Sequence, residues 1–331
     1  MRPTHLLLLV PLLALAAEPL PPAPAATPRP NTGFSHVTTR PDRVIVFKTI
    51  GPVELRLHVF TPPAKNRPPL SPSLSPSLTP AIVYFFGGGW RSGDPKQFFW
   101  QARYLADRGI TGFCAEYRVK QTHGTSPVEA VADAKSAIRY LRAHAAELSL
   151  DPHRLAACGN SSGAHLAAAT GLCLTGDDST DGSPKISSRP DALLLFDTPV
   201  ELLVRADIVE RFPSPESARA FSPLQNLRAD APPMLLWHGA ADPGLPVALT
   251  ENFAARAREL GVDAAVSVWP GGVHGFYHYG RDRTPDVRAA FLATTLSIDR
   301  WLAARGWLTG EPDEPALLAL ISNPNPNPAP R

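Results

Sequence analysis

The sequence predicts an α/β fold in which helices cover both faces of one mostly parallel sheet. Short apolar runs alternate along the chain with longer segments whose apolar residues recur at helical spacing, a pattern typical of this class. Runs that are apolar throughout indicate strands buried on both faces, as parallel strands usually are. The chain has 331 residues, of which 44% are hydrophobic, so it is long enough to form one large core.

The individual strands follow from the short apolar or alternating runs, and the helices follow from the segments of helical spacing. Two alternating stretches, residues 44–49 and 53–60, predict an antiparallel pair that opens the sheet. Six further strands are predicted at residues 81–86, 110–117, 154–158, 192–196, 234–237 and 264–269, which makes an eight-stranded sheet. Helices are predicted at residues 97–107, 128–148, 163–173, 247–260 and 285–304. Gly109 and Gly261 are well placed to end two of them.

The first residues of the chain are typical of a secretory signal. Arg2 precedes an apolar run at residues 6–15, and small residues follow, so we expect a signal peptide over residues 1–17 and an exported protein. The alternative is that the start codon is wrongly assigned. A signal peptide begins with a positively charged region, and Arg2 is the only side chain before the apolar run that is always charged. The remaining chain divides into a Pro-rich segment (18–40), the folded domain (41–310) with a disordered Pro/Ser-rich insertion (62–80), and a Pro-rich tail (311–331).

Composition excludes several classes of partner. The formal net charge is +2, and no run of Lys or Arg forms the basic surface that nucleic-acid binding needs. After the signal, no apolar segment has the length of about 20 residues that a membrane-spanning helix requires. The three cysteines, Cys114, Cys158 and Cys173, are an odd number in apolar or helical surroundings, which indicates buried thiols and no disulfide framework.

A Gly-x-Ser-x-Gly motif stands between a predicted strand and a predicted helix. In the segment RLAACGNSSGAHLAAA, Gly159 and Gly163 bracket Ser161, so the glycine register selects Ser161 and not Ser162 as a nucleophile. A sharp turn of this kind pushes the serine hydroxyl out of the sheet, and glycines avoid collisions in the turn. The helix that follows points its first amides toward a reacting carbonyl oxygen. The other interpretation is an ordinary Gly/Ser turn.

Three glycines follow the strand at residues 81–86. Consecutive glycines let the backbone approach a ligand closely, so the amides of Gly88 and Gly89, with that of Ser162, are predicted to hold the negative oxygen of a tetrahedral intermediate. The alternative is a flexible turn that only leads to the next helix. A phosphate-binding loop is disfavoured, because no Lys-Ser or Lys-Thr follows at the required spacing.

Chain order predicts the general base and the acid that orients it. In this architecture the acid and then the histidine follow the serine. Asp242 comes after the strand at 234–237, and His274 comes after the last strand, so these two complete a Ser161–His274–Asp242 triad. His278 is the alternative base and Asp197 the alternative acid. His165 and His238 lie on a helix and a strand end, which favours structural roles for both.

These segments together resemble exported bacterial esterases of the α/β-hydrolase superfamily. The resemblance covers residues 81–308 and rests on FFGGGWRSGDPKQF, AEYRV, VEAVADAKSAIRYLRAHAAEL, GNSSGAH, PPMLLWHGAADPGLPV and GGVHGFYHYG. It points to acetyl-esterase, acetylxylan-esterase and feruloyl-esterase-like proteins. It implies the α/β-hydrolase fold, the same site residues, hydrolysis of short acyl esters on carbohydrate, and no cofactor or metal. Phe86 stands where many relatives have histidine, and Asn160 and Ala164 also depart from the common pattern.

We therefore expect two-step acyl transfer through an acyl-enzyme on Ser161. The segment before Val44 holds no amphipathic helix to form a cap, so we expect an open site that accepts a small-molecule or glycan ester with a short acyl group. The segment at residues 199–230 lacks a clear period and is expected to lie over the sheet edge, where it bears on substrate choice. Two rivals are a prolyl-oligopeptidase-like peptidase and an inactive binding relative.

The expected strand order makes a prediction about Cys114 and Cys158. The strand that ends in the glycine loop lies between their two strands, and neighbouring strands are about 4.8 Å apart. Bridged cysteines need Cα atoms within about 7 Å, so no Cys114–Cys158 disulfide should form. Mass spectrometry of the digested, non-reduced protein checks this. A linked peptide would contradict both the strand order and the buried-thiol interpretation.

Overall fold

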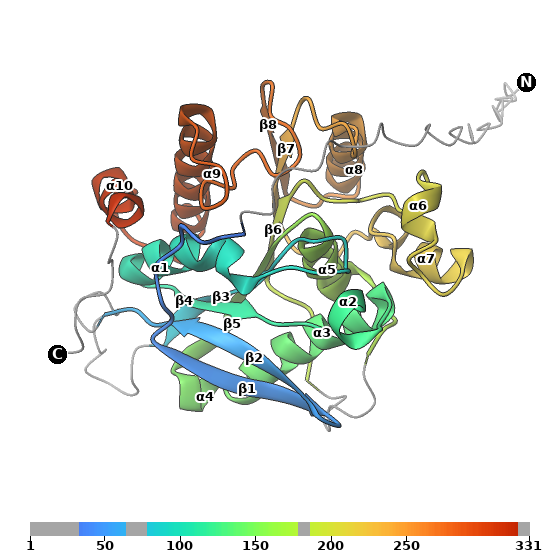
Figure 1. The fold of residues 1–331 in the computed structure, drawn as a ribbon, viewed down its shortest axis with the longest axis horizontal. Coiled ribbons are helices and arrows are strands. Elements are labelled where there is room, and N and C mark those ends of the chain that lie inside the picture. The colour runs from blue at the N-terminus through green and yellow to red at the C-terminus, as the bar shows by residue number, and fades with distance from the viewer. Residues whose placement is uncertain (1–32, 64–77, 178–185, 324–331) are drawn as a thin grey trace, which may run out of the picture.

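The structure is a computed structural model that describes residues 33–63, 78–177 and 186–323 (Figure 1). The predicted signal peptide, residues 1–17, lies outside the described residues, so export stays a prediction. Parts of the Pro-rich segments lie outside them as well. The described chain forms one eight-stranded sheet covered by helices on both faces, which is the α/β-hydrolase fold.

The strands lie in the order β1-β2-β4-β3-β5-β6-β7-β8. The pairs β1–β2 and β2–β4 are antiparallel, and every other neighbouring pair is parallel. All eight predicted strands are present, with ends shifted by a few residues. Their bounds are β1 Arg43–Ile50, β2 Val53–Phe60, β3 Thr79–Phe85, β4 Thr111–Ala115, β5 Leu150–Asn160, β6 Ala192–Phe196, β7 Met234–Gly239 and β8 Ala264–Trp269.

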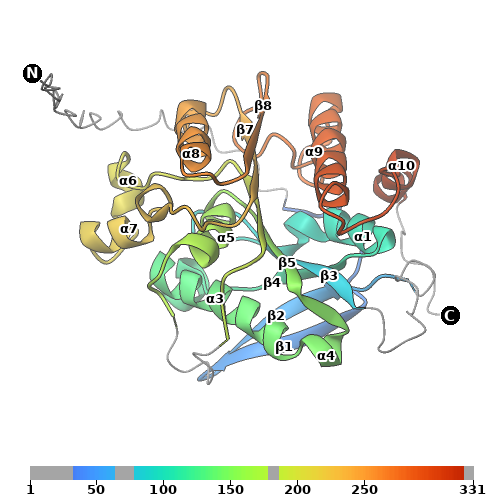
Figure 2. The same cartoon turned by 180° about the vertical axis from the view of Figure 1, so that it is seen from behind.

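The longer helices form two layers, one on each side of the sheet (Figures 1 and 2). One layer contains α1 (Phe99–Arg108), α9 (Pro285–Ala303) and α10 (Glu314–Ser322), and the other contains α3 (Pro127–Ala143), α5 (Ser162–Leu172) and α8 (Val247–Glu259). Shorter elements are α2 (Lys120–His123), α4 (Ala145–Leu148), α6 (Ala206–Val209), α7 (Pro215–Phe221) and the 3-10 turns η2 (Pro95–Phe98) and η3 (Leu224–Asn226). The described helices include none that is long and apolar enough to cross a membrane.

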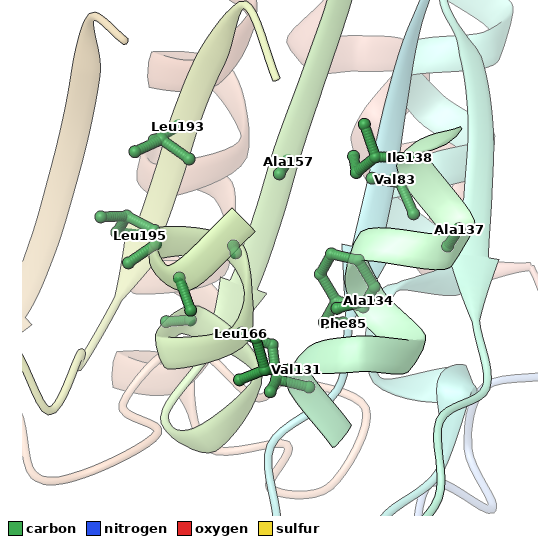
Figure 3. Packing of buried hydrophobic residues seen from close by; sticks show 14 of the residues in the cluster. Val83, Phe85, Val131, Ala134, Ala137, Ile138, Ala157, Leu166, Leu193 and Leu195 are labelled. Atoms are coloured by element: carbon green, nitrogen blue, oxygen red, sulfur yellow. The ribbon is translucent and has the colours of Figure 1, made fainter. Parts of the chain in front are cut away.

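The core lies on both faces of the sheet because successive strand residues point to opposite sides. On β3, Val83 and Phe85 face the layer of α3 and α5, whereas Ile82 and Tyr84 face the layer of α1 and α9. Figure 3 shows the first of these clusters: Val83, Phe85, Ala157, Leu193 and Leu195 from the strands, with Val131, Ala134, Ala137, Ile138 and Leu166 from the helices. Each large aliphatic side chain buried in this way contributes about 1.5–3 kcal/mol.

The position of β3 confirms the expected separation of two cysteines. In the sheet register, Tyr84 of β3 is the partner of Cys114 on one side and of Cys158 on the other. Both thiols, and that of Cys173, are free and buried. Burial raises the pKa of all three above the ordinary thiol value, which keeps them protonated and unreactive.

The C-terminal segment differs from the Pro-rich tail predicted over residues 311–331. Helix α10 forms inside it, and Leu317 and Ile321 on one face of this helix are buried against the layer of α1 and α9. Asp313 caps the helix by accepting from the Ala316 amide at 2.9 Å, and its own amide donates to the Tyr104 hydroxyl. Because prolines surround this short segment in the sequence, its helical spacing of apolar residues was not recognised.

The insertion predicted over residues 62–80 also ends earlier than expected. Residues 64–77 lie outside the described residues, but Thr79 and Pro80 already belong to β3. The pairing of β3 with β5 is irregular between Thr79 and Ala81, where Pro80 has no amide hydrogen to donate. The Thr79 amide donates instead to the Ser149 carbonyl at 2.9 Å, so the strand is anchored ahead of the proline.

Candidate active site

Ser161 stands on a strained turn between β5 and α5. Its φ is 52° and its ψ is −121°, a conformation that costs a non-glycine residue free energy. The turn needs both glycines of the motif, because a β-carbon on Gly159 would collide with the Gly163 carbonyl and one on Gly163 would collide with the Phe85 carbonyl. Ser162, by contrast, has a buried side chain, so the hydroxyl that reaches the surface hollow is that of Ser161.

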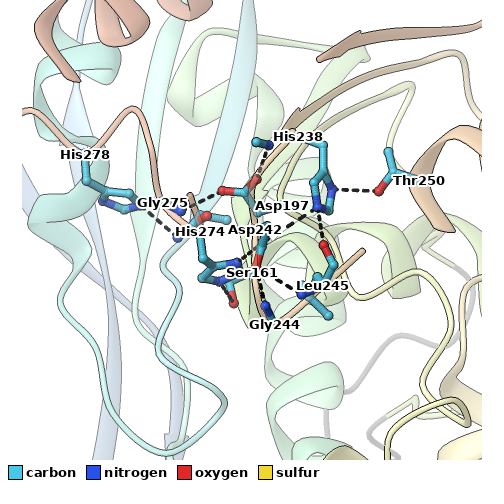
Figure 4. Close-up of polar contacts among 12 residues, drawn as sticks. Ser161, Asp197, His238, Asp242, Gly244, Leu245, Thr250, His274, Gly275 and His278 are labelled. Atoms are coloured by element: carbon cyan, nitrogen blue, oxygen red, sulfur yellow. Dashed lines mark hydrogen bonds and ion pairs between the residues drawn. The ribbon is translucent and has the colours of Figure 1, made fainter. Parts of the chain in front are cut away.

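The structure brings the three predicted triad residues together (Figure 4). His274 Nε2 lies 2.8 Å from Ser161 Oγ, and His274 Nδ1 lies 2.6 Å from Asp242 Oδ2. The other carboxylate oxygen of Asp242 accepts from the amides of Gly244 and Leu245, at 2.8 and 3.0 Å. Asp242 follows β7 and His274 follows β8, so the carboxyl ends of parallel strands deliver both side chains to one edge of the sheet.

The carboxylate and the imidazole shift each other's ionisation. Burial raises the pKa of Asp242, but the hydrogen bond to His274 and its positive charge outweigh burial and hold this pKa below 3.8. Burial lowers the pKa of His274, but the hydrogen bond to Asp242 and the charges of Asp197 and Asp242 outweigh it, so this pKa lies above 6.5. An imidazole whose pKa is raised in this way is a stronger base for the Ser161 proton.

Asp197, the alternative acid, has a different role in the structure. Its carboxylate is fully buried and accepts from the amides of Gly239 and Gly275, at 3.1 and 2.8 Å. Gly275 directly follows His274, so Asp197 ties the histidine loop to the end of β7. Its charge still acts on His274 through space, but it is Asp242 that accepts the hydrogen bond from the imidazole Nδ1. The geometry therefore favours Asp242 as the orienting acid.

His278, the alternative base, does not contact Ser161. Its Nε2 lies 2.8 Å from Asn160 Nδ2, so this ring nitrogen accepts from the amide of the residue before the serine. Burial first, and then the nearby positive charges of His274 and Arg281, lower the pKa of His278 to about 3, so the ring stays neutral. His278 thus holds Asn160 at the start of the turn that carries the serine. Of the two histidines, it is His274 that reaches the Ser161 hydroxyl.

The two histidines that were expected to be structural are enclosed by protein groups. His165 Nε2 lies 2.9 Å from the Phe221 carbonyl oxygen, and burial lowers the pKa of this ring to about 4. His238 lies 2.7 Å from the Leu245 carbonyl oxygen and 2.8 Å from Thr250 Oγ1. The contact with Leu245 holds the loop that carries Asp242, and the contact with Thr250 joins the ring to α8, so this histidine supports the acid of the triad.

The glycine loop corrects one part of the predicted oxyanion site. The Gly88 amide donates to Ser162 Oγ at 3.0 Å, so it fastens the loop to α5 and is not a free donor. The amide of Gly89 has no acceptor among the described residues, and that of Ser162 is the first of α5, where no helical acceptor exists. The two predicted donors that remain available beside Ser161 are therefore Gly89 and Ser162.

Two side chains that the sequence did not single out hold this loop. Gln97 bonds both backbone groups of Gly87, donating to its carbonyl and accepting from its amide at 2.8 Å each. The Tyr117 hydroxyl donates to the Phe86 carbonyl at 2.7 Å, and the two rings stack with centroids 4.1 Å apart. The stack of Phe86 on Tyr117 thus packs the start of the glycine loop.

Two hollows meet at Ser161. The larger, about 850 Å³, extends past the His274 loop and is lined by Phe34, His36, Gln97, Asn160, Val273, Phe276, Arg281 and Arg283, among others. The smaller, about 190 Å³, lies beneath the segment at residues 199–230 and is lined by Trp90, Ser162, Pro199, Arg205, Ile208, Arg211 and Leu245, among others. Phe34 and His36 come from the segment predicted to be only Pro-rich, so the N-terminal chain narrows a site expected to be open.

The described residues contain one group that is close enough to hold a metal ion, namely Asp197, His238 and Asp242, whose ligand atoms lie within 4.8 Å of one another. Every one of these atoms already has a protein partner. Asp197 accepts from two amides, His238 contacts Leu245 and Thr250, and Asp242 bonds His274 and two amides. The three side chains therefore act as hydrogen-bond partners within the protein.

A comparison with solved structures identifies the family. Thermogutta terrifontis esterase 2 superimposes with a TM-score of 0.73 and 35% sequence identity, covering 81% of this chain and 96% of the esterase. This chain belongs to the serine carboxylic-ester hydrolases of the α/β-hydrolase fold. Further structures of the Thermogutta esterase show it bound to propionate, bound to butyrate, and phosphorylated by paraoxon.

Two family models match different parts of the present chain. Residues 70–189 match the BD-FAE model, and residues 194–298 match the prolyl oligopeptidase family. Endo-1,4-beta-xylanase B of Butyrivibrio fibrisolvens is 30% identical over 183 residues, which cover 51% of this chain and 28% of the xylanase. A probable isoprenylcysteine alpha-carbonyl methylesterase of Arabidopsis thaliana is 29% identical over 217 residues, 58% of this chain and 44% of that protein. The chain thus matches less than half the length of both these relatives.

The ionisation of His274 sets the expected pH dependence of ester hydrolysis. The imidazole must be neutral to accept the serine proton, so kcat/KM should rise with pH, and the raised pKa places the midpoint above 6.5. Asp242→Asn removes the hydrogen bond and charge that raise this pKa. The midpoint should therefore move to lower pH, and kcat at the plateau should fall by about 10⁴.

A pH series of kcat/KM for both proteins measures this. Glu251→Gln, which alters a carboxylate on the exposed side of α8, is the control and should keep the original midpoint. An unchanged midpoint in Asp242→Asn would mean that another acid orients His274.

Proposed function

We propose that this chain hydrolyses short-chain acyl esters of carbohydrate, with Ser161 as nucleophile, His274 as general base and Asp242 as the acid that orients His274. The observation that carries the proposal is the continuous chain of hydrogen bonds from Ser161 through His274 to Asp242. It stands at the meeting point of two hollows of unequal size. An ester bound there would divide between them, with its carbonyl carbon at Ser161.

The reaction proceeds in two halves that use the same groups. Ser161 Oγ attacks the ester carbonyl while His274 Nε2 takes the hydroxyl proton, and the amides of Gly89 and Ser162 hold the resulting oxyanion. When the tetrahedral intermediate collapses, His274 returns the proton to the alcohol oxygen, which leaves. Water then attacks the acyl-enzyme by the same route and releases the carboxylic acid. No cofactor takes part in either half.

The small hollow supports a short acyl group. Its volume of about 190 Å³ is less than a quarter of the roughly 850 Å³ of the large hollow. Pro199, Ile208 and Leu245 supply apolar wall. The propionate and butyrate bound to the Thermogutta esterase are acids of the size that this hollow would take. Longer chains would lose the gain of about 0.8 kcal/mol per buried methylene once they leave the hollow.

The large hollow supports a bulky, hydrated alcohol. It is several times the size of the small one and combines the aromatic rings of Phe34 and Phe276 with the polar side chains of His36, Gln97 and Arg281. Sugars have apolar ring faces and hydroxyl edges, so they bind where aromatic and hydrogen-bonding groups alternate. The similarity to a xylanase from Butyrivibrio fibrisolvens agrees with a carbohydrate alcohol.

A peptidase is the second candidate, and one observation favours it. Residues 194–298, which carry Asp242 and His274, match the prolyl oligopeptidase family. Serine esterases and serine peptidases share the triad, so the assays must include an amide. A proline-containing p-nitroanilide provides this test, and cleavage of the anilide faster than of any ester would favour the peptidase.

The substrate proposal predicts a chain-length profile. Across p-nitrophenyl esters, kcat/KM should be highest between acetyl and butyryl and should fall for longer chains, and acetylated xylan should release acetate. Steady-state kinetics and acetate titration measure the two effects, with Ser161→Ala as the control for background hydrolysis. Activity that keeps rising through octanoate, with no acetate released from the glycan, would contradict the proposal and indicate a lipase.

A further inference from the structure

The small hollow beside Ser161 has two arginines in its wall. Both belong to the segment between β6 and β7, and both bind one carboxylate, that of Asp207. Arg205 makes two bonds to it, from Nε at 2.8 Å and from Nη2 at 2.9 Å, and its Nη1 donates to the Gly244 carbonyl. Arg211 donates from Nη2 to Asp207 Oδ2 at 2.9 Å and from Nε to the Asp207 carbonyl at 3.0 Å.

One positive charge of this cluster is not balanced. Burial raises the pKa of Asp207, but the bonds and charges of Arg205 and Arg211 outweigh burial and lower this pKa, so the carboxylate is ionised. Two guanidinium groups therefore share a single negative charge. Asp207 does not itself line the small hollow, and the described residues that do line it include no carboxylate. The hollow is thus positive in net charge as well as partly apolar.

The unused donor is Nη1 of Arg211. All three donor groups of Arg205 are bonded, whereas Arg211 Nη1 has no hydrogen-bond partner among the described residues. A β-carbon on Gly89 would lie 2.9 Å from this nitrogen, so Nη1 stands directly over the glycine loop. The Arg211 side chain is 30% exposed, and it lines the small hollow as well as a neighbouring hollow of about 340 Å³.

Arg211 is also held firmly enough to select a ligand. Its guanidinium lies over the Trp90 ring, 5.9 Å from the centroid, and Asp207 lies one helical turn before it in the chain. A guanidinium fixed on two sides keeps its remaining N–H groups in one direction, and a carboxylate is the group that this geometry matches best.

We propose that Arg211 selects acyl groups that end in a carboxylate, so that the preferred substrates are half-esters of short dicarboxylic acids. The inference rests on the proposed function, because it needs Ser161 to attack an ester whose acyl chain lies in the small hollow. It names the acyl class of that reaction. Among neutral acyl groups the short ones remain preferred, and a terminal carboxylate adds a charge-assisted hydrogen bond to Arg211 Nη1.

The test compares two esters of equal chain length, ethyl butyrate and monoethyl succinate, which differ in a terminal methyl against a carboxylate. Acid release is followed by titration at constant pH. The wild-type enzyme should have the higher kcat/KM for monoethyl succinate. In Arg211→Gln, kcat/KM for monoethyl succinate should fall about 10- to 100-fold, mostly through KM, because a hydrogen bond to a charged group contributes about 1.5–3 kcal/mol. The value for ethyl butyrate should change by less than about threefold.

Arg256→Gln is the matched control, because it removes one positive charge from the exposed face of α8. It should leave the ratio of the two kcat/KM values unchanged. An equal loss for both esters in Arg211→Gln would show that Arg211 only supports the loop, and would overturn the proposal. The wild-type ratio is informative even if this variant does not fold.

A wild-type enzyme that prefers ethyl butyrate also overturns the proposal, while the esterase function stands. If the wild type hydrolyses neither ester, nor any p-nitrophenyl ester, the proposed function itself fails, and this inference fails with it.

Discussion

The close approach of α5 to β3 and β5 is the constraint on which the whole site depends. The helix packs so tightly that Gly159 and Gly163 leave no space for a β-carbon against neighbouring carbonyl groups. This approach forces Ser161 to a φ of 52°, a conformation that the surrounding sheet must hold in place. It also puts the Ser162 hydroxyl within reach of the Gly88 amide, so the turn that presents the nucleophile fixes the glycine loop too.

Two buried carboxylates then organise the other half of the site. Asp242 bonds the imidazole of His274, and Asp197 bonds the amide of Gly275 that follows it. One acid therefore orients the ring while the other positions the backbone that carries it. Both negative charges raise the pKa of His274, which makes the histidine a better base than burial alone would allow. The chemistry thus uses a pair of acids from neighbouring strands, only one of which touches the histidine ring.

Motifs with a fixed chain order made most of this site predictable. The eight strands, the position of β3 between the two buried cysteines, and the meeting of Ser161, Asp242 and His274 all follow from local patterns whose order the fold preserves. Features that depend on tertiary contacts carried no such signal. Phe34 reaches the large hollow from a Pro-rich segment, α10 packs through an apolar face that prolines conceal, and the Gly88 amide is engaged by a serine side chain. The position of Arg211 over Gly89 likewise depends on how the 199–230 segment folds back over the sheet edge.

The most direct test of the account is covalent labelling with paraoxon, followed by mass spectrometry of the intact and digested protein. A serine activated by His274 attacks the phosphorus and expels p-nitrophenolate, so the serine keeps the diethyl phosphate group, whereas an ordinary hydroxyl does not react. We expect one adduct per chain, located on Ser161, and none in Ser161→Ala or in protein unfolded before labelling. An adduct on Ser162, an adduct that persists in Ser161→Ala, or no adduct on the active wild-type enzyme would contradict the account.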